Sequence, residues 1–145
     1  AYGAPENGSP AIEAADPNNI PADDILGNPR PVGAASDIGA YEFAPALTLS
    51  GAPANQTIRL TWSVNAEVPA TTTWQIDYTG PVGNQTPPIT NIISPTRAYT
   101  LTGLTNYTWY TVILTALLGG SPFLTDTATV MPTDVILYLP VVIKE

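Results

Sequence analysis

Residues 104–116, LTNYTWYTVILTA, decide the fold of this chain. In the second half of this stretch apolar residues recur at every second position, the period of a β-strand with one buried face. Leu104 precedes Tyr110 by six residues, across a short polar turn. This spacing lets the tyrosine ring pack inward while its hydroxyl bonds to the backbone upstream, an arrangement called a tyrosine corner. The stretch therefore predicts a corner followed by a long central strand, with these residues on its inner face: Tyr110, Val112, Leu114 and Ala116.

Further strands follow from the same alternation on both sides of this stretch. The first is expected to end at Gly51-Ala52-Pro53, and residues 65–73 are expected to form a loop. Turn formers separate the runs every eight to twelve residues, which is typical of a β-sandwich. Seven strands are predicted, near residues 47–49, 58–62, 74–78, 89–93, 99–101, 110–116 and 128–130. The predicted core consists of Trp62, Trp74, Ile76, Tyr99, Leu101, Leu104, Tyr110, Val112 and Leu114.

These residues also carry a resemblance to a known family. A tryptophan stands late in the second strand (Trp62), and the third strand reads aromatic-x-aliphatic-x-aromatic from Trp74 to Tyr78. Together with the corner, this pattern resembles a fibronectin type III domain over residues 46–133. The resemblance implies a seven-stranded, all-β sandwich. Asn106 stands where the family often has proline, and this departure is expected to loosen the turn.

Threonine marks the boundary of this domain. It is absent from residues 1–46 and appears twenty times in the other ninety-nine residues. Threonine favours the half-buried surface of strands, so the β-rich domain is expected to begin near Ala46. We therefore predict three parts: an irregular Pro/Gly/Asp-rich segment at 1–45, the sandwich at 46–133, and an extra apolar strand at 134–145.

The first part has a resemblance of its own. Residues 8–19, GSPAIEAADPNN, and 25–43, ILGNPRPVGAASDIGAYEF, resemble the closing coil of right-handed parallel β-helix proteins that bacteria secrete. The family usually has Asp where Glu13 stands. The resemblance implies a secreted or cell-surface setting. It brings no activity, because the family's substrate grooves lie on helical coils that this sequence lacks.

Acidic side chains gather in this segment. Asp16, Asp23 and Asp24, with neighbouring asparagines, offer the oxygen ligands that calcium prefers, but their spacing does not match an EF-hand loop. Capping of turns by these side chains is the favoured interpretation, and no metal or cofactor is assigned. Arg30 is the only base among seven acids of residues 1–45 and is expected to pair with Asp37 or Asp24.

Composition excludes several kinds of chemistry. The chain has no histidine and no cysteine, so Ser-His and Cys-His nucleophiles are impossible within it. Its net charge of −8 argues against nucleic acid and against anionic membrane surfaces as partners. The longest apolar run, residues 135–143, has nine residues with Pro140 inside, too short for a membrane span. We therefore predict that the chain is not an enzyme.

Apolar residues outside the predicted core are the candidate interaction sites. Outward positions on the central strand suggest a covered surface, whose partner is sugar, another domain or residues 1–45 folding back. The apolar run 135–143, VILYLPVVI, also needs cover. It either pairs with an edge of residues 1–45 or adds to an edge of a neighbouring copy, as donor strands do, giving an oligomer or filament. The candidates are Trp109, Ile113, Leu118, Phe123, Val135, Leu137, Tyr138 and Leu139.

Two functions remain open from the sequence. The first is a non-catalytic structural or adhesive module of a bacterial secreted or cell-surface protein, which assembles with copies of itself or with domains of its parent protein. The second is an accessory module of a secreted polysaccharide-degrading enzyme, which binds carbohydrate or acts as a spacer. A planar strip of exposed aromatic residues would favour the second, and the sequence offers Trp109 with Tyr107 for it.

Overall fold

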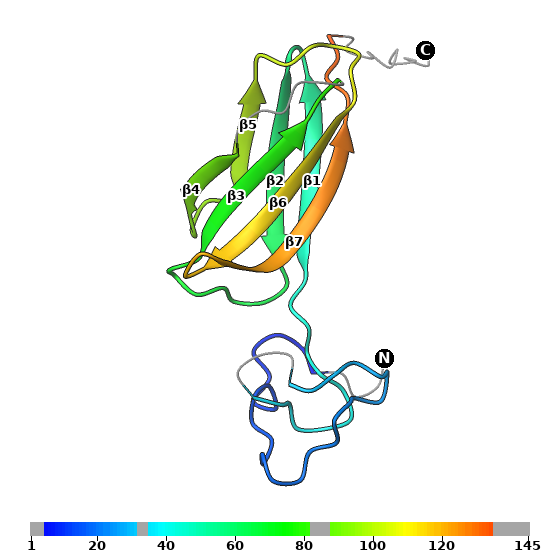
Figure 1. Cartoon of the computed structure of the whole chain (residues 1–145), viewed down its shortest axis with the longest axis vertical. Coiled ribbons are helices and arrows are strands. Elements are labelled where there is room, and N and C mark those ends of the chain that lie inside the picture. The colour runs from blue at the N-terminus through cyan, green and yellow to red at the C-terminus, as the bar shows by residue number, and fades with distance from the viewer. Residues whose placement is uncertain (1–4, 32–34, 82–87, 135–145) are drawn as a thin grey trace, which may run out of the picture. The chain divides into compact units, whose positions relative to one another are not determined.

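The chain folds into two compact units (Figure 1). A computed structural model describes residues 5–31, 35–81 and 88–134. One unit consists of residues 1–46 with 64–68, and the other of residues 47–63 with 69–145. Within the described ranges no helix is long and apolar enough to cross a membrane. The predicted strand in the C-terminal run lies outside the described residues.

The second unit is a sandwich of two sheets, with the four-stranded sheet in front of the three-stranded one in Figure 1. The strand orders are β1-β2-β5 and β4-β3-β6-β7. The pairs β2–β5, β3–β4, β3–β6 and β6–β7 are antiparallel, and the predicted all-β fold with seven strands is confirmed. The strands are β1 (Leu47–Ala54), β2 (Thr57–Val64), β3 (Thr73–Thr79), β4 (Ile89–Ile93), β5 (Ala98–Thr102), β6 (Tyr110–Leu118) and β7 (Ser121–Val130).

Side chains on the facing sides of the two sheets form the core. Trp62 of β2 and Trp74 of β3 meet edge to face, with ring centroids 5.7 Å apart. Of the nine residues predicted to be buried, eight are buried. Tyr99 is the exception and is half-buried, although Leu101 on the same strand, β5, is only 2% exposed.

The tyrosine corner is confirmed. The backbone N–H of Thr105 donates a hydrogen bond to the Tyr110 hydroxyl at 3.0 Å, and Tyr110 itself is buried. The central strand β6 is thus fixed at its start to the segment that leads into it. These sheets and this corner make the unit a fibronectin type III-like sandwich.

The expectation that Asn106 loosens the corner is wrong. Its side-chain oxygen accepts a hydrogen bond from the backbone N–H of Gln56 at 2.7 Å, and its Nδ2 donates to Asn55 Oδ1 at 2.8 Å. The backbone N–H of Leu104 donates to the Gln56 carbonyl at 3.0 Å. The asparagine therefore ties the corner to the β1–β2 turn, which a proline ring could not do.

The first strand also differs from its prediction. β1 continues through Gly51 and Pro53 to Ala54 instead of ending there. β1 is an edge strand, where the missing N–H of a proline need not break a ladder. A Cβ on Gly51 would lie 2.5 Å from Cγ2 of Val130, so the glycine allows the close approach of β1 to β7.

Candidate functional site

The outer face of the four-stranded sheet is mostly uncharged. Cross-strand neighbours on it are Thr111 with Thr129, Thr115 with Thr125, and Ile113 with Thr127. On β3, the Gln75 amide donates to the Asp77 carboxylate at 2.8 Å, and Asp77 lies opposite Ile113. Among the described outward positions of β3, β6 and β7, Asp77 is the only charged residue.

An apolar row interrupts this polar face. The inward residues of β6, such as Val112, are inaccessible, so the residues between them face outward. Trp109, immediately before β6, is 63% exposed, and Ile113 is 40% exposed. Thr111 lies between them and is half-buried. We call Trp109, Thr111 and Ile113 the outer row. Their predicted outward orientation agrees with these exposures.

Leu118 and Phe123 belong to a different place. Both lie at the turn between β6 and β7 and are 42% and 41% exposed. They are separated from Trp109 by the whole of β6, about 30 Å for nine extended residues. The structure therefore divides the predicted interaction residues into the outer row and this turn. The remaining candidates, Val135, Leu137, Tyr138 and Leu139, lie outside the described residues.

The chain leaves the sandwich beside the outer row. The backbone N–H of Tyr107 donates to the Pro132 carbonyl at 2.8 Å, and the Tyr107 hydroxyl donates to the Asp134 carboxylate. This second bond is the main cause that raises the pKa of Tyr107. Tyr107, two residues before Trp109, thus binds both Pro132 and Asp134 at the end of the described chain. The described chain therefore ends near the start of β6.

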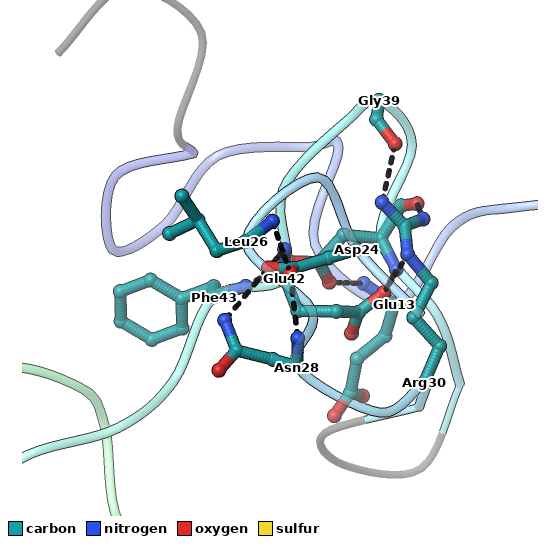
Figure 2. Close-up of polar contacts among 9 residues, drawn as sticks. Glu13, Asp24, Leu26, Asn28, Arg30, Gly39, Glu42 and Phe43 are labelled. Carbon is teal, nitrogen blue, oxygen red and sulfur yellow. Dashed lines mark hydrogen bonds and ion pairs between the residues drawn. The ribbon is translucent and has the colours of Figure 1, made fainter. Parts of the chain in front are cut away.

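A polar cluster organises the N-terminal unit (Figure 2). The Asp24 carboxylate accepts hydrogen bonds from the backbone N–H groups of Leu26 and Asn28 and from the Asn28 side chain, at 2.8–2.9 Å. It also accepts one from the backbone N–H of Glu42 at 3.3 Å. The Asn28 side chain is the largest cause that lowers the pKa of Asp24, to about 2. Within residues 5–31 and 35–46 the β-pairing consists of one isolated bridge, between Asp23 and Pro29. Side-chain oxygens therefore accept hydrogen bonds that backbone carbonyls would accept in a sheet.

The predicted partner of Arg30 is wrong. Arg30 Nε lies 3.4 Å from Glu42 Oε1, an ion pair in which both side chains are nearly inaccessible. The guanidinium also donates to the backbone carbonyls of Asp37 and Gly39, at 3.3 and 2.7 Å. The carboxylate of Asp37 itself accepts from the backbone N–H groups of Glu13 and Phe43. Glu42 Oε1 also accepts a hydrogen bond from the backbone N–H of Asp37 at 3.1 Å, so this carboxylate links the arginine to the backbone.

Turn capping by the acidic side chains is confirmed at two positions. Asp16 accepts from the backbone N–H of Asn18 at 3.0 Å, and Asp24 does so from Leu26. Each is an aspartate bonded to the amide two residues on, which is an Asx turn. Over residues 5–31, 35–81 and 88–134 the structure brings together no group of three or more acidic side chains that could hold a metal ion.

Sequence reasoning missed some exposed apolar residues. Ile93 of β4 is 65% exposed, and Ile25, Leu26 and Ile38 of the N-terminal unit are more than half exposed. Ile92 and Ile93 are adjacent in one strand, so one of them must face outward. That alternation was the available signal for Ile93. The irregular N-terminal unit has no period and gave no such signal.

Comparisons with known proteins concern the fold alone. No protein-family model and no curated protein matches the sequence. A crystal structure of the FN5 domain of Drosophila Lar is 20% identical, with a TM-score of 0.44, over 61% of this chain and 92% of that one. A structure described as a myokine is 20% identical, with a TM-score of 0.48, over 62% of this chain and 97% of that one.

Proposed function

We propose that the chain is a non-catalytic structural module of a bacterial secreted or cell-surface protein, and that it assembles with copies of itself through the outer row. A fibronectin type III-like sandwich suggests a structural or interaction module. The observation that carries the proposal is the exposure of Trp109 and Ile113, at 63% and 40%, on a face whose other described side chains are mostly threonine. Exposed aromatic and aliphatic side chains on one face are typical of surfaces that bind protein.

The use of the carboxylates supports a structural role. In the N-terminal unit Asp24 and Asp37 accept hydrogen bonds from backbone amides, and Glu42 pairs with Arg30. These carboxylates thus stabilise the backbone conformation of the N-terminal unit. Without histidine or cysteine, the side chains left for general-base catalysis are carboxylates, tyrosines and Lys144. The bacterial and extracellular setting rests on the resemblance of residues 8–43.

Sedimentation velocity over a wide concentration range tests the assembly. The unaltered chain is expected to associate as concentration rises, and the double variant Trp109→Ser, Ile113→Thr is expected to remain monomeric. Ile93→Thr is the matched control, because Ile93 is equally apolar and 65% exposed but lies on β4 at the edge of the sheet. Association that persists unchanged in the double variant would contradict the proposal.

Carbohydrate binding is the second candidate, and one observation favours it. The exposed indole of Trp109 can stack on a sugar ring, and the Gln75–Asp77 pair offers hydrogen-bonding groups on the same face. Co-sedimentation with insoluble cellulose, chitin and xylan separates the two functions. The first function is replaced by this one if two results are obtained. The unaltered chain stays monomeric, and it binds a polysaccharide that the Trp109→Ser variant does not bind.

A further inference from the structure

Residues 135–143, VILYLPVVI, carry no charge and alternate between two apolar sets. In an extended conformation one set is entirely aliphatic and includes Val135, Leu137 and Leu139, and the other includes Tyr138 and Pro140. A strand that is apolar on both sides is normally buried on both sides. We call these nine residues the C-terminal segment. Its sequence therefore requires cover.

The strand that carries the outer row resembles this segment in length and in its lack of charge. Nine extended residues span about 30 Å, which is the length of β6, and the outer row, from Trp109 to Ile113, occupies about 13 Å at its start. The stretch from Trp109 to Leu118 contains no charged residue, and neither does the C-terminal segment. The threonine methyl groups beside the row, such as that of Thr127, add apolar surface. A segment laid along the row therefore meets indole and aliphatic groups. The charged group beside the row is Asp77, which lies opposite Ile113 and whose carboxylate accepts a hydrogen bond from the Gln75 amide.

The segment of the same chain is poorly placed to cover the row. β7 runs toward the end of the sheet where β6 begins, and the chain is held there by the Tyr107–Asp134 bond. Covering its own row would require a reversal directly after Asp134. The next residues are Val135 and Ile136, which are β-branched and unsuited to tight turns.

We propose that the C-terminal segment of one copy docks on the outer row of a second copy. This inference rests on the proposed function and names the part of the second copy that binds. The donor is the end of the chain, and the acceptor is a sheet face, so the two surfaces differ. Such a contact is heterologous and gives a closed ring or an open filament. Pro140 is compatible with packing on a face, where the segment needs no continuous ladder of hydrogen bonds.

Complementation between two full-length variants tests the proposal. The donor variant carries Leu137→Asp and Leu139→Asp, which place charges in the segment. The acceptor variant carries Trp109→Ser and Ile113→Thr, which remove the apolar row. Each variant alone is expected to be monomeric in sedimentation velocity. Their equimolar mixture is expected to form a complex of two copies and no larger species. The acceptor variant contributes the one intact segment, and the donor variant contributes the one intact row. Thermal melts show whether both variants are folded.

Failure of the inference is distinguishable from failure of the proposed function. If the donor variant assembles like the unaltered chain while the acceptor variant does not, the row binds another part of the second copy. The proposed function then stands and this inference is overturned. A mixture that stays monomeric, although the unaltered chain assembles, also overturns it.

If the unaltered chain is monomeric, iodide quenching of its tryptophan fluorescence shows whether the segment covers the outer row of its own chain. Trp62 and Trp74 are buried, so Trp109 is the one tryptophan of three that iodide should reach, about a third of the emission. If the accessible fraction rises from near zero in the unaltered chain to about a third in the donor variant, the segment covers its own row. If it is about a third in both, the segment is not on the row. Both results overturn the proposal.

Discussion

The Asp126 carboxylate on β7 accepts a hydrogen bond from the backbone N–H of Leu49 on β1, at 2.7 Å. Asp126 lies opposite Leu114, on the inner side of its sheet. The bond joins the two sheets along the side where their edge strands β1 and β7 meet. A charged side chain that points inward at a sheet edge also disfavours the addition of a foreign strand there. This edge is therefore both closed and protected.

Replacing Asp126 by alanine is expected to lower the free energy of unfolding by about 1–3 kcal/mol, because the N–H of Leu49 loses its acceptor. Asp126→Asn keeps one side-chain oxygen and should cost less. Urea unfolding followed by tryptophan fluorescence measures both, since all three tryptophans lie in the sandwich. Equal stability of the alanine variant and the unaltered chain would show that the bond does not hold the sheets.

The corner hydroxyl is the subject of a second prediction. Tyr110→Phe keeps the buried ring and removes the acceptor of the Thr105 N–H, at an expected cost of about 0.5–1.5 kcal/mol. Tyr78→Phe is the matched control, because the Tyr78 ring packs beside Tyr110, with centroids 6.4 Å apart, and the corner bond stays intact. Urea unfolding should separate the two variants. If both lose the same stability, the corner bond contributes nothing of its own.

Asn106 gives a third prediction, which reverses the view taken from the family pattern. Asn106→Ala removes the bond from Gln56 and the bond to Asn55, with an expected loss of about 1–2 kcal/mol. Asn106→Pro should not restore it, because proline has no side-chain oxygen or amide to replace them. Asn55→Ala removes only the second bond and should cost less. A proline variant as stable as the unaltered chain would contradict this account.

The sequence predicted the sandwich well because burial on one side of a strand leaves a period of two. Val112 and Leu114 are completely inaccessible, and Trp109 and Ile113 point outward, as that period requires. The same period gives the side of a strand that faces the core but not the degree of burial. Tyr99 and Leu101 lie two residues apart on β5, and Leu101 is 2% exposed, whereas Tyr99 remains half-exposed.

The polar cluster was beyond the reach of pattern reasoning. Seven acids precede the sandwich, and charge alone cannot choose the partner of Arg30 among them. Backbone N–H groups bond to the carboxylates of Asp24, Asp37 and Glu42 alike, and Glu42 is the one that also lies against the arginine. This selection depends on the path of an irregular backbone, which leaves no period in the sequence.

The last prediction concerns acid stability of the N-terminal unit. Hydrogen bonds from Asn28 and from nearby backbone amides lower the pKa of Asp24 from 3.8 to about 2. Because the pKa is lower in the folded chain than in the unfolded one, the carboxylate stabilises the fold above about pH 4, and this contribution is lost as the pH falls through about 2. NMR spectra of the Leu26 and Asn28 amides should report the loss in that window. Tryptophan fluorescence serves as the control, because no tryptophan lies in residues 1–46. Asp24→Asn should remove this pH dependence and weaken the unit at neutral pH. If the two amides keep their chemical shifts below pH 2 in the unaltered chain, or shift identically in Asp24→Asn, the carboxylate does not organise the unit.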